Sequence, residues 1–321
     1  MNYFIFSSEL ELLGTMPVND YLVWDRNFYD TSNIEAQINF NKSDFEILNA
    51  ENYIYKKDTD EFAIIENIKV VDGENKCINI SARGLSSILD RRIVTSYDVA
   101  DKTIINELFY QLVLKNCINP DVSARKIPNL TAENISSNIV VSLGNINMRN
   151  LLDVIKEYAV KYKVGFRIDL DLESKIMTFK TLIPVDKTSD IIFSKNFGNV
   201  LEQTYYKQLR DYKNVSYSNE GTVIEGTATG LSRREVFTDT LDSYKAIDTL
   251  ETVPNLNAYP EYLKDYDLGD IVMTKNTDLG IVEPKIITQI RESYSEGGRQ
   301  IELTFGAPVP TLLDKIKRSV K

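Results

Sequence analysis

The chain has 321 residues, enough for about two domains, since a single hydrophobic core stops growing usefully beyond roughly 250 residues. Its hydrophobic fraction of 43% and charged fraction of 26% are typical of a folded soluble protein. Lys and Arg number 37 against 47 Asp and Glu, and the resulting net charge of −10 argues against specific binding of nucleic acid through its phosphates.

The chain contains no histidine. This excludes Ser-His-Asp and Cys-His active sites and every metal site that uses imidazole. An enzyme with this composition would have to rely on carboxylates, on a lysine, or on magnesium or calcium held by carboxylates.

No stretch approaches the roughly 20 apolar residues of a membrane helix, and residues 1–6 lack the features of a signal peptide. We therefore expect a protein that is made in the cytoplasm and does not insert into a membrane. Cys77 and Cys117 fit reduced thiols better than a disulfide framework, although a single disulfide stays open.

The first hundred residues have the period of β-strands. Apolar and polar residues alternate over 36–40 and again over 78–82, which follows a turn at 72–74. The run 63–71 is the predicted partner across that turn. After it, the apolar spacing of 85–89 predicts a short helix that ends near Arg91 and Arg92.

From about residue 100 the spacing is helical. Thr103 is predicted to cap a helix over 104–112, and Asn147 a helix over 151–162 that Gly165 ends.

Two alternating runs follow, at 166–170 and 177–181, and they predict a hairpin. With the two helices before it, this hairpin makes up a small α/β module.

The remainder returns to strands. Short strand-like runs at 214–217, 222–228 and 233–237 are typical of a β-barrel or β-sandwich. A longer hairpin is predicted between 285–294 and 299–305, across two glycines.

The last eleven residues predict a short basic helix with one apolar face. That face consists of Leu312, Leu313, Ile316 and Val320. It is apolar enough that we expect it to dock against another chain, either a neighbouring copy or a further protein of the assembly.

Carboxylate pairs at i, i+2 spacing can serve as the acid and base of a glycosidase. Such pairs are Glu9 with Glu11, Asp169 with Asp171, and Asp265 with Asp267. In a chain this acidic, solvated surface charge explains them better. Phosphate-binding glycine loops are absent. We therefore predict no catalytic residue, no metal site and no cofactor.

Two pairs of arginines are adjacent in the sequence, Arg91 with Arg92 and Arg233 with Arg234. Arginine pairs favour bidentate contacts with carboxylates, so these four are candidates for clamps between subunits or domains. The alternative is a local surface ion pair of less than about 1 kcal/mol.

Six short motifs occur in an order that resembles the hub proteins of phage tails. They are Leu22–Arg26, Ser81–Gly84 leading to Leu89–Ile93, Phe193–Ser194 followed by Phe197–Leu201, Gly230–Glu235, Leu268–Val272 and Leu303–Gly306. The resemblance covers nearly the whole chain. The family includes the tail hubs of siphophages and myophages and of phage-tail-like bacteriocins (tailocins), with the hub fold of contractile injection systems.

The resemblance implies an α+β, mainly β fold with two β-barrel domains that mimic subunits of the tail tube. The first barrel would span 1–98 and the second 191–308, with the α/β module at 99–190 between them and a C-terminal helix at 309–321.

The resemblance also implies a function, a structural hub in a virion or tailocin baseplate, assembled in the bacterial cytoplasm. Its expected form is a homotrimeric ring that joins the six-fold tail tube to the three-fold spike or tip. The expected partners are the tube or a distal tube adaptor, the spike, and other baseplate proteins.

Related hubs can carry a fused peptidoglycan hydrolase, but here only about fifteen residues follow the last motif. The alternatives are a carboxylate-based tail lysin that acts on cell-wall carbohydrate, or a peripheral receptor-binding protein.

Overall fold

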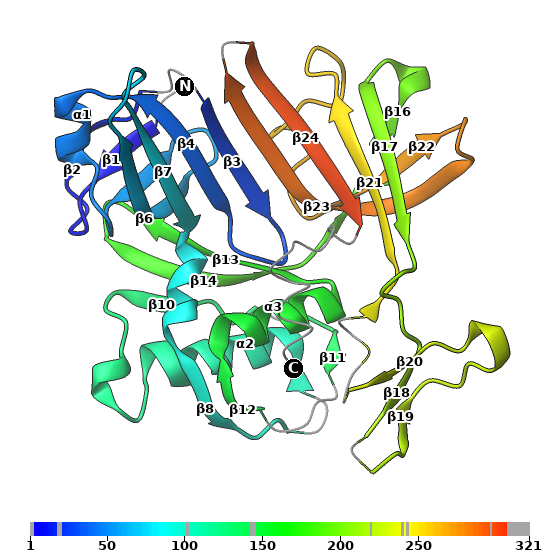
Figure 1. Cartoon of the computed structure of the whole chain (residues 1–321). Helices are drawn as coiled ribbons and strands as arrows, with labels where there is room; N and C mark the ends of the chain where they lie inside the picture. The colour runs from blue at the N-terminus through cyan, green and yellow to red at the C-terminus, as the bar shows by residue number, and fades with distance from the viewer. Residues whose placement is uncertain are drawn as a thin grey trace.

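One long β-sheet runs through the computed structural model and contains strands from both ends of the chain (Figure 1). The structure describes residues 3–17, 21–100, 103–135, 137–141, 146–218, 220–238, 241, 244–295 and 297–306. The predicted C-terminal helix at 309–321 lies outside these residues. The mainly β fold with a small helical module is confirmed.

The long sheet has 14 strands. In chain order they are β1 (Tyr3–Phe6), β2 (Leu12–Thr15), β3 (Tyr21–Asn27), β4 (Asn33–Asn39), β5 (Tyr53–Lys56), β6 (Glu61–Val71), β7 (Cys77–Gly84), β15 (Val185–Asp186), β16 (Ile192–Ser194), β17 (Val200–Gln208), β21 (Ile247–Pro254), β22 (Asp270–Asn276), β23 (Ile281–Ser295) and β24 (Gly298–Gly306). A short helix, α1 (Lys42–Ile47), lies between β4 and β5.

The strands pair in the order β17-β21-β24-β23-β3-β4-β7-β6-β5-β1-β2, and β22 joins β23 to the short strands β15 and β16. The two hairpins predicted in this sheet, β6 with β7 and β23 with β24, are confirmed. The N-terminal and C-terminal strands meet where β3 pairs antiparallel with β23. Among the described strands this path does not close on itself, so it ends in two open edges, β17 and β2.

Each half of the sheet has its own hydrophobic core because strand side chains alternate between two faces. Trp24, Ile34 and Ile80 belong to the core beneath the N-terminal strands. Phe193, Leu303 and Phe305 belong to the core beneath the C-terminal strands. Two cores on one continuous sheet are the main feature of the architecture.

The α/β module packs beneath the N-terminal half of the sheet (Figure 1). Its elements are the 3-10 helix η1 (Leu85–Arg91), β8 (Ile93–Tyr97), β9 (Thr103–Ile104), α2 (Ile105–Val113), the π-helix η2 (Leu114–Ile118), η3 (Ser123–Arg125), β10 (Leu130–Ala132), β11 (Val140–Val141), β12 (Ile146–Asn150), α3 (Leu151–Tyr162), β13 (Gly165–Asp171) and β14 (Ile176–Leu182). The predicted hairpin is β13 with β14, and both helices are found.

The predicted ends of these helices are wrong in three places. Thr103 lies in β9, and α2 begins without a side-chain cap. Asn147 lies in β12, which pairs with β8 as far as Asn150, and the side chain of Asn150 caps α3. Lys163 ends α3 in the left-handed conformation, with φ of 55°, so Gly165 is not the cap.

The runs predicted at 214–237 form a separate three-stranded sheet rather than part of a barrel wall. It consists of β18 (Val215–Tyr217), β19 (Val223–Glu225) and β20 (Glu235–Phe237), with the 3-10 helix η5 (Gly230–Ser232) before β20. Figure 1 shows this small sheet projecting below the C-terminal half of the long sheet. Another 3-10 turn, η4 (Lys195–Phe197), precedes β17.

Gly165 has a packing role instead of a capping role. A Cβ at this position would lie 2.4 Å from a ring carbon of Phe28, and a Cβ at Gly269 would lie 2.3 Å from the same carbon. Phe28 follows β3 directly and is buried. The same edge of the ring therefore lies against the backbone of the α/β module and against that of the segment before β22.

We predict that Gly165→Ala lowers the free energy of unfolding by about 1–3 kcal/mol, the usual effect of overpacking a core. Gly73→Ala is the matched control because a Cβ there meets nothing within 4 Å. Chemical denaturation measures both changes. In a Phe28→Leu background the same Gly165→Ala change should cost less. An equal cost in both backgrounds would show that the ring is not the cause.

Candidate functional site

The first predicted interface pair lies at the end of η1. The Arg91 guanidinium donates to both carboxylate oxygens of Glu51, at 3.0 and 3.2 Å. Arg92 donates from Nε to the carbonyl oxygen of Arg125 at 2.7 Å, and its own carbonyl oxygen accepts from the backbone N–H of Leu151. Arg91 is therefore an exposed ion-pair partner, whereas Arg92 connects η1 to η3 and α3.

The second pair lies in the small sheet of β18, β19 and β20. Arg233 forms an ion pair with Glu235 and donates to the Tyr217 hydroxyl at 2.6 Å. Arg234 donates to the carbonyl oxygen of Leu209 at 2.6 Å. All four predicted arginines thus bind within their own chain, and their role as clamps between chains stays a prediction.

The other predicted interface residues are Leu312, Leu313, Ile316 and Val320. They lie outside the described residues.

Two of the three predicted carboxylate pairs, Asp169 with Asp171 and Asp265 with Asp267, are held by structural contacts, and Asp171 accepts from the backbone N–H of Ser174 at 2.6 Å. Glu9 and Glu11 are exposed between β1 and β2. Asp169 forms ion pairs with Arg167 and Lys180. Asp267 pairs with the buried Arg26, while Asp265 accepts from the backbone N–H of Glu261 at 2.8 Å.

Two further features of the described residues bear on possible sites. The described residues contain no group of three or more His, Cys, Asp or Glu arranged to hold a metal. None of the helices in these ranges is long and apolar enough to cross a membrane.

The main polar feature of the fold is an ionic cluster with a buried centre at each end, Arg26 and Glu292, and it spans the pairing of β3 with β23. We call it the junction cluster. Its members are Arg26, Lys56, Glu61, Tyr262, Asp267, Glu292, Tyr294 and Arg299.

Arg26 is the N-terminal centre of the junction cluster and is only 3% exposed. Its Nε donates to Glu61 at 2.7 Å, and its guanidinium also binds Asp267 and donates to the Tyr262 hydroxyl at 2.9 Å. Burial alone would lower the pKa of Arg26, but the charge of Glu61 and the other acceptors hold this pKa well above its usual value. The guanidinium is therefore a permanent charge shared between distant segments of the chain.

Glu292 is the C-terminal centre and is fully buried. It forms an ion pair with Lys56, and its carboxylate accepts from Tyr294 at 2.7 Å and from Arg299 at 2.8 Å. Tyr262 donates to it as well, at 2.9 Å, and so connects the two centres. Burial raises the pKa of Glu292, but Lys56 and the other donors outweigh this and bring it down to about 2.

The cysteines play no part in this cluster. Both thiols are free, and Cys117 alone of the two is buried. Burial raises the pKa of the Cys117 thiol to about 12, so it stays protonated and inert at neutral pH.

The sequence matches the family model described as Siphovirus ReqiPepy6 Gp37-like protein over residues 2–242 and 225–307. No curated protein sequence matches the chain.

Several solved structures share the fold over nearly the whole chain. The 43 kDa tail protein of prophage MuSo2 from Shewanella oneidensis has a TM-score of 0.59 at 11% identity, covering 96% of this chain and 99% of that chain. The prophage tail protein gp18 from Listeria monocytogenes EGD-e has a TM-score of 0.57 at 12% identity, covering 100% and 98%. A tail protein from Neisseria meningitidis MC58 has a TM-score of 0.56 at 11% identity, covering 95% of both chains.

We predict that Lys56→Met lowers the free energy of unfolding by about 3–5 kcal/mol, because it removes one partner of a buried ion pair. Lys264→Met is the matched control, since its pair with Glu261 is largely exposed and its loss should leave stability nearly unchanged. Urea denaturation measures both.

The free energy of unfolding, measured as the pH is lowered, tests the same cluster. The pKa of Glu292 is depressed from 4.5 to about 2 in the folded state, so its stabilisation is complete above its unfolded pKa. Stability should fall as the pH drops from 4.5 towards 2, and less steeply in Lys56→Met than in the parent. The same decrease of stability with pH in Lys56→Met and in the parent would contradict the conclusion that Lys56 lowers the pKa of Glu292.

Proposed function

The chain belongs to the Siphovirus ReqiPepy6 Gp37-like family of phage tail proteins, and from this membership we propose that it forms the structural hub of the tail. In this proposal three copies make a ring that joins the six-fold tail tube to the three-fold spike. The ring lies in the baseplate of a virion or of a tailocin and assembles in the bacterial cytoplasm.

The observation that carries the proposal is the pairing of two separately cored β-rich flanks in one sheet. If each flank presents one tube-facing unit, one chain offers two and three chains offer six. A three-fold ring can then match a six-fold tube with a single gene product. The junction cluster supports this, because it fixes the two flanks in one relative orientation.

The open edges of the sheet also suit a ring. β2 and β17 lie at opposite ends of the pairing order, and each exposes an apolar side chain, Leu12 at 59% and Leu201 at 63%. Exposed edges invite pairing with other chains unless something covers them. Head-to-tail contact between neighbouring copies would cover both edges, and Arg91, Arg92, Arg233 and Arg234 are the candidates to fix its orientation.

The stoichiometry of the ring is the first test. We expect a cryo-EM reconstruction of the particle to contain three copies of this chain per ring, each facing two tube subunits. Because the tube or the spike can be required for closure, the mass of the isolated protein does not decide the matter. Six copies per ring, or contact between each chain and a single tube subunit, would overturn the proposal.

We also propose that the chain has no catalytic activity, since it lacks histidine and two of its three predicted carboxylate pairs are engaged in structural contacts. The purified protein should leave peptidoglycan intact, as judged by chromatography of released muropeptides. Release that disappears on Asp169→Asn or Asp267→Asn would instead favour the alternative of a carboxylate-based lysin. Asp186→Asn is the control for an exposed aspartate outside these pairs.

A further inference from the structure

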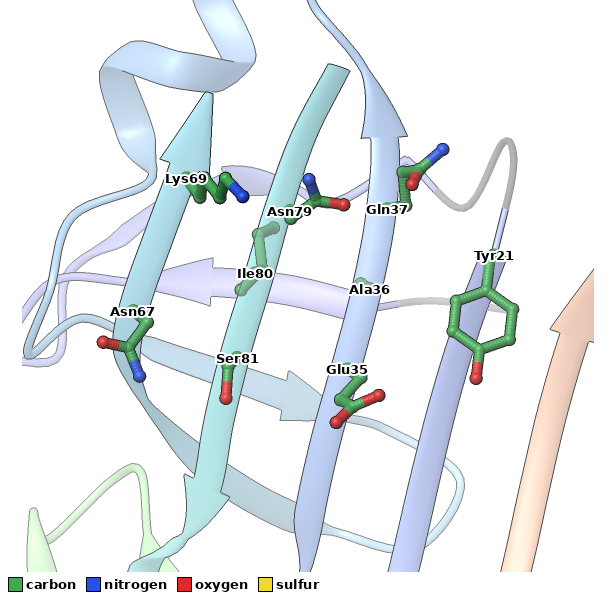
Figure 2. Close-up of a pocket in the computed structure, with 9 residues that line it drawn as sticks. All are labelled: Tyr21, Glu35, Ala36, Gln37, Asn67, Lys69, Asn79, Ile80 and Ser81. Atoms are coloured by element: carbon green, nitrogen blue, oxygen red, sulfur yellow. The ribbon is translucent and has the colours of Figure 1, made fainter. Parts of the chain in front are cut away.

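The outer face of the N-terminal strands contains a shallow polar hollow, with a volume of about 320 Å³. Figure 2 shows its lining side chains on four neighbouring strands, β3, β4, β7 and β6. The strand register places them in two rows across the sheet. One row is Lys69, Asn79, Gln37 and Tyr21, and the other is Asn67, Ser81 and Glu35.

These side chains have few polar contacts with the rest of the described protein. Within the part of the chain that the structure describes, the only polar contact from the two rows is a long one of 4.0 Å, from the Asn79 amide to the Cys77 sulfur. By contrast, Arg83 on the same strand β7 pairs with both Glu66 and Asp90. The hollow is therefore a set of donors and acceptors that remain available to a ligand.

The charges in the hollow balance. Glu35 lies on β4 and Lys69 on β6, with β7 between them, and they do not form an ion pair with each other. An anionic ligand would meet a single cation, and a cationic ligand a single carboxylate. The other polar groups are amides and hydroxyls, which both donate and accept hydrogen bonds, and Ala36 and Ile80 complete the lining. This set complements a neutral ligand that is rich in hydroxyl groups.

The shape favours a chain over a single small molecule. Four strands at about 4.8 Å spacing span about 14 Å, and the hollow lies open on the sheet face. Tyr21 stands at one end of its row, 38% exposed, where its ring can pack against the apolar face of a sugar.

From these features we propose that the outer-face hollow binds a neutral glycan chain. Gln37 and Asn79 are the central hydrogen-bonding pair and Tyr21 is the stacking group. This proposal goes beyond the structural hub function and does not depend on it.

The test uses the purified full-length chain and four sugars, namely chitotetraose, maltotetraose and their monosaccharides. Saturation-transfer NMR reports binding, and titration gives the dissociation constants. At least one tetrasaccharide should bind with a millimolar or lower dissociation constant and roughly tenfold more tightly than its monosaccharide, since several hydrogen bonds are made along the chain.

The double variant Gln37→Ala with Asn79→Ala should weaken binding by roughly tenfold or more, because two amide contacts are lost. Gln300→Ala is the matched control. Gln300 is exposed on the same face of the sheet, on β24, but lies outside the hollow. Tyr21→Phe should retain binding and Tyr21→Ala should weaken it.

Three results would overturn the proposal. They are no binding of either tetrasaccharide at millimolar concentration, equal binding by the double variant and the parent, and binding of a monosaccharide as tight as that of its tetrasaccharide. Thermal unfolding of each variant verifies that the fold is intact, as expected for substitutions on an exposed face.

Discussion

The pairing of β3 with β23 is the interaction on which the rest of the structure depends, because it makes one sheet from the two ends of the chain. The pairing is specified by charge as well as by hydrogen bonds. A slip of one residue would move the side chain of Arg26 or Glu292 to the opposite face of the sheet and separate it from its partners. An unpaired charge at these buried positions is far more costly than a lost surface contact. The junction cluster therefore fixes the register of two strands that are distant in sequence.

The same strand also positions the α/β module. Phe28 follows β3 directly, and its ring lies against Gly165 of β13 and Gly269 before β22. The backbone of Phe28 donates to the carbonyl oxygen of Thr288 at 2.9 Å, so the contact is tied to β23 as well. Strand β3, the α/β module and the segment before β22 thus meet at Phe28, two residues after Arg26 of the junction cluster. Because the contact is closely packed, a change in one of these parts is transmitted to the others.

The sequence predicted the elements whose evidence is local. The two long hairpins and the two helices of the module follow from side-chain period, and all are present. The helix ends were missed because strand pairing, which no local pattern reveals, continues as far as Asn150. The separate small sheet was missed for the same reason, since short alternating runs do not say which sheet they join.

The junction cluster was also missed, although the sequence contains a signal for it. Arg26 continues the inward phase of Leu22 and Trp24, and Glu292 lies between Ile290 and Tyr294 in the inward phase of β23. Lys56 follows Ile54 in the same way on β5. All of these positions are buried. A charged residue in the inward phase of a strand implies a buried partner. The identity of that partner could not be predicted, because it depends on strands far apart in the chain.

The two faces of the sheet differ in whether their charged side chains have partners. On the inner face every charge of the junction cluster has partners. These contacts restrict the pairing of β3 with β23 to one register, even if apolar residues at the same positions would give a fold of equal stability. On the outer face Glu35 and Lys69 form no ion pair with any residue that the structure describes, so they add little to stability. The first property holds the two β-rich flanks in one relative orientation. The second leaves that surface available for contacts that the fold itself does not need.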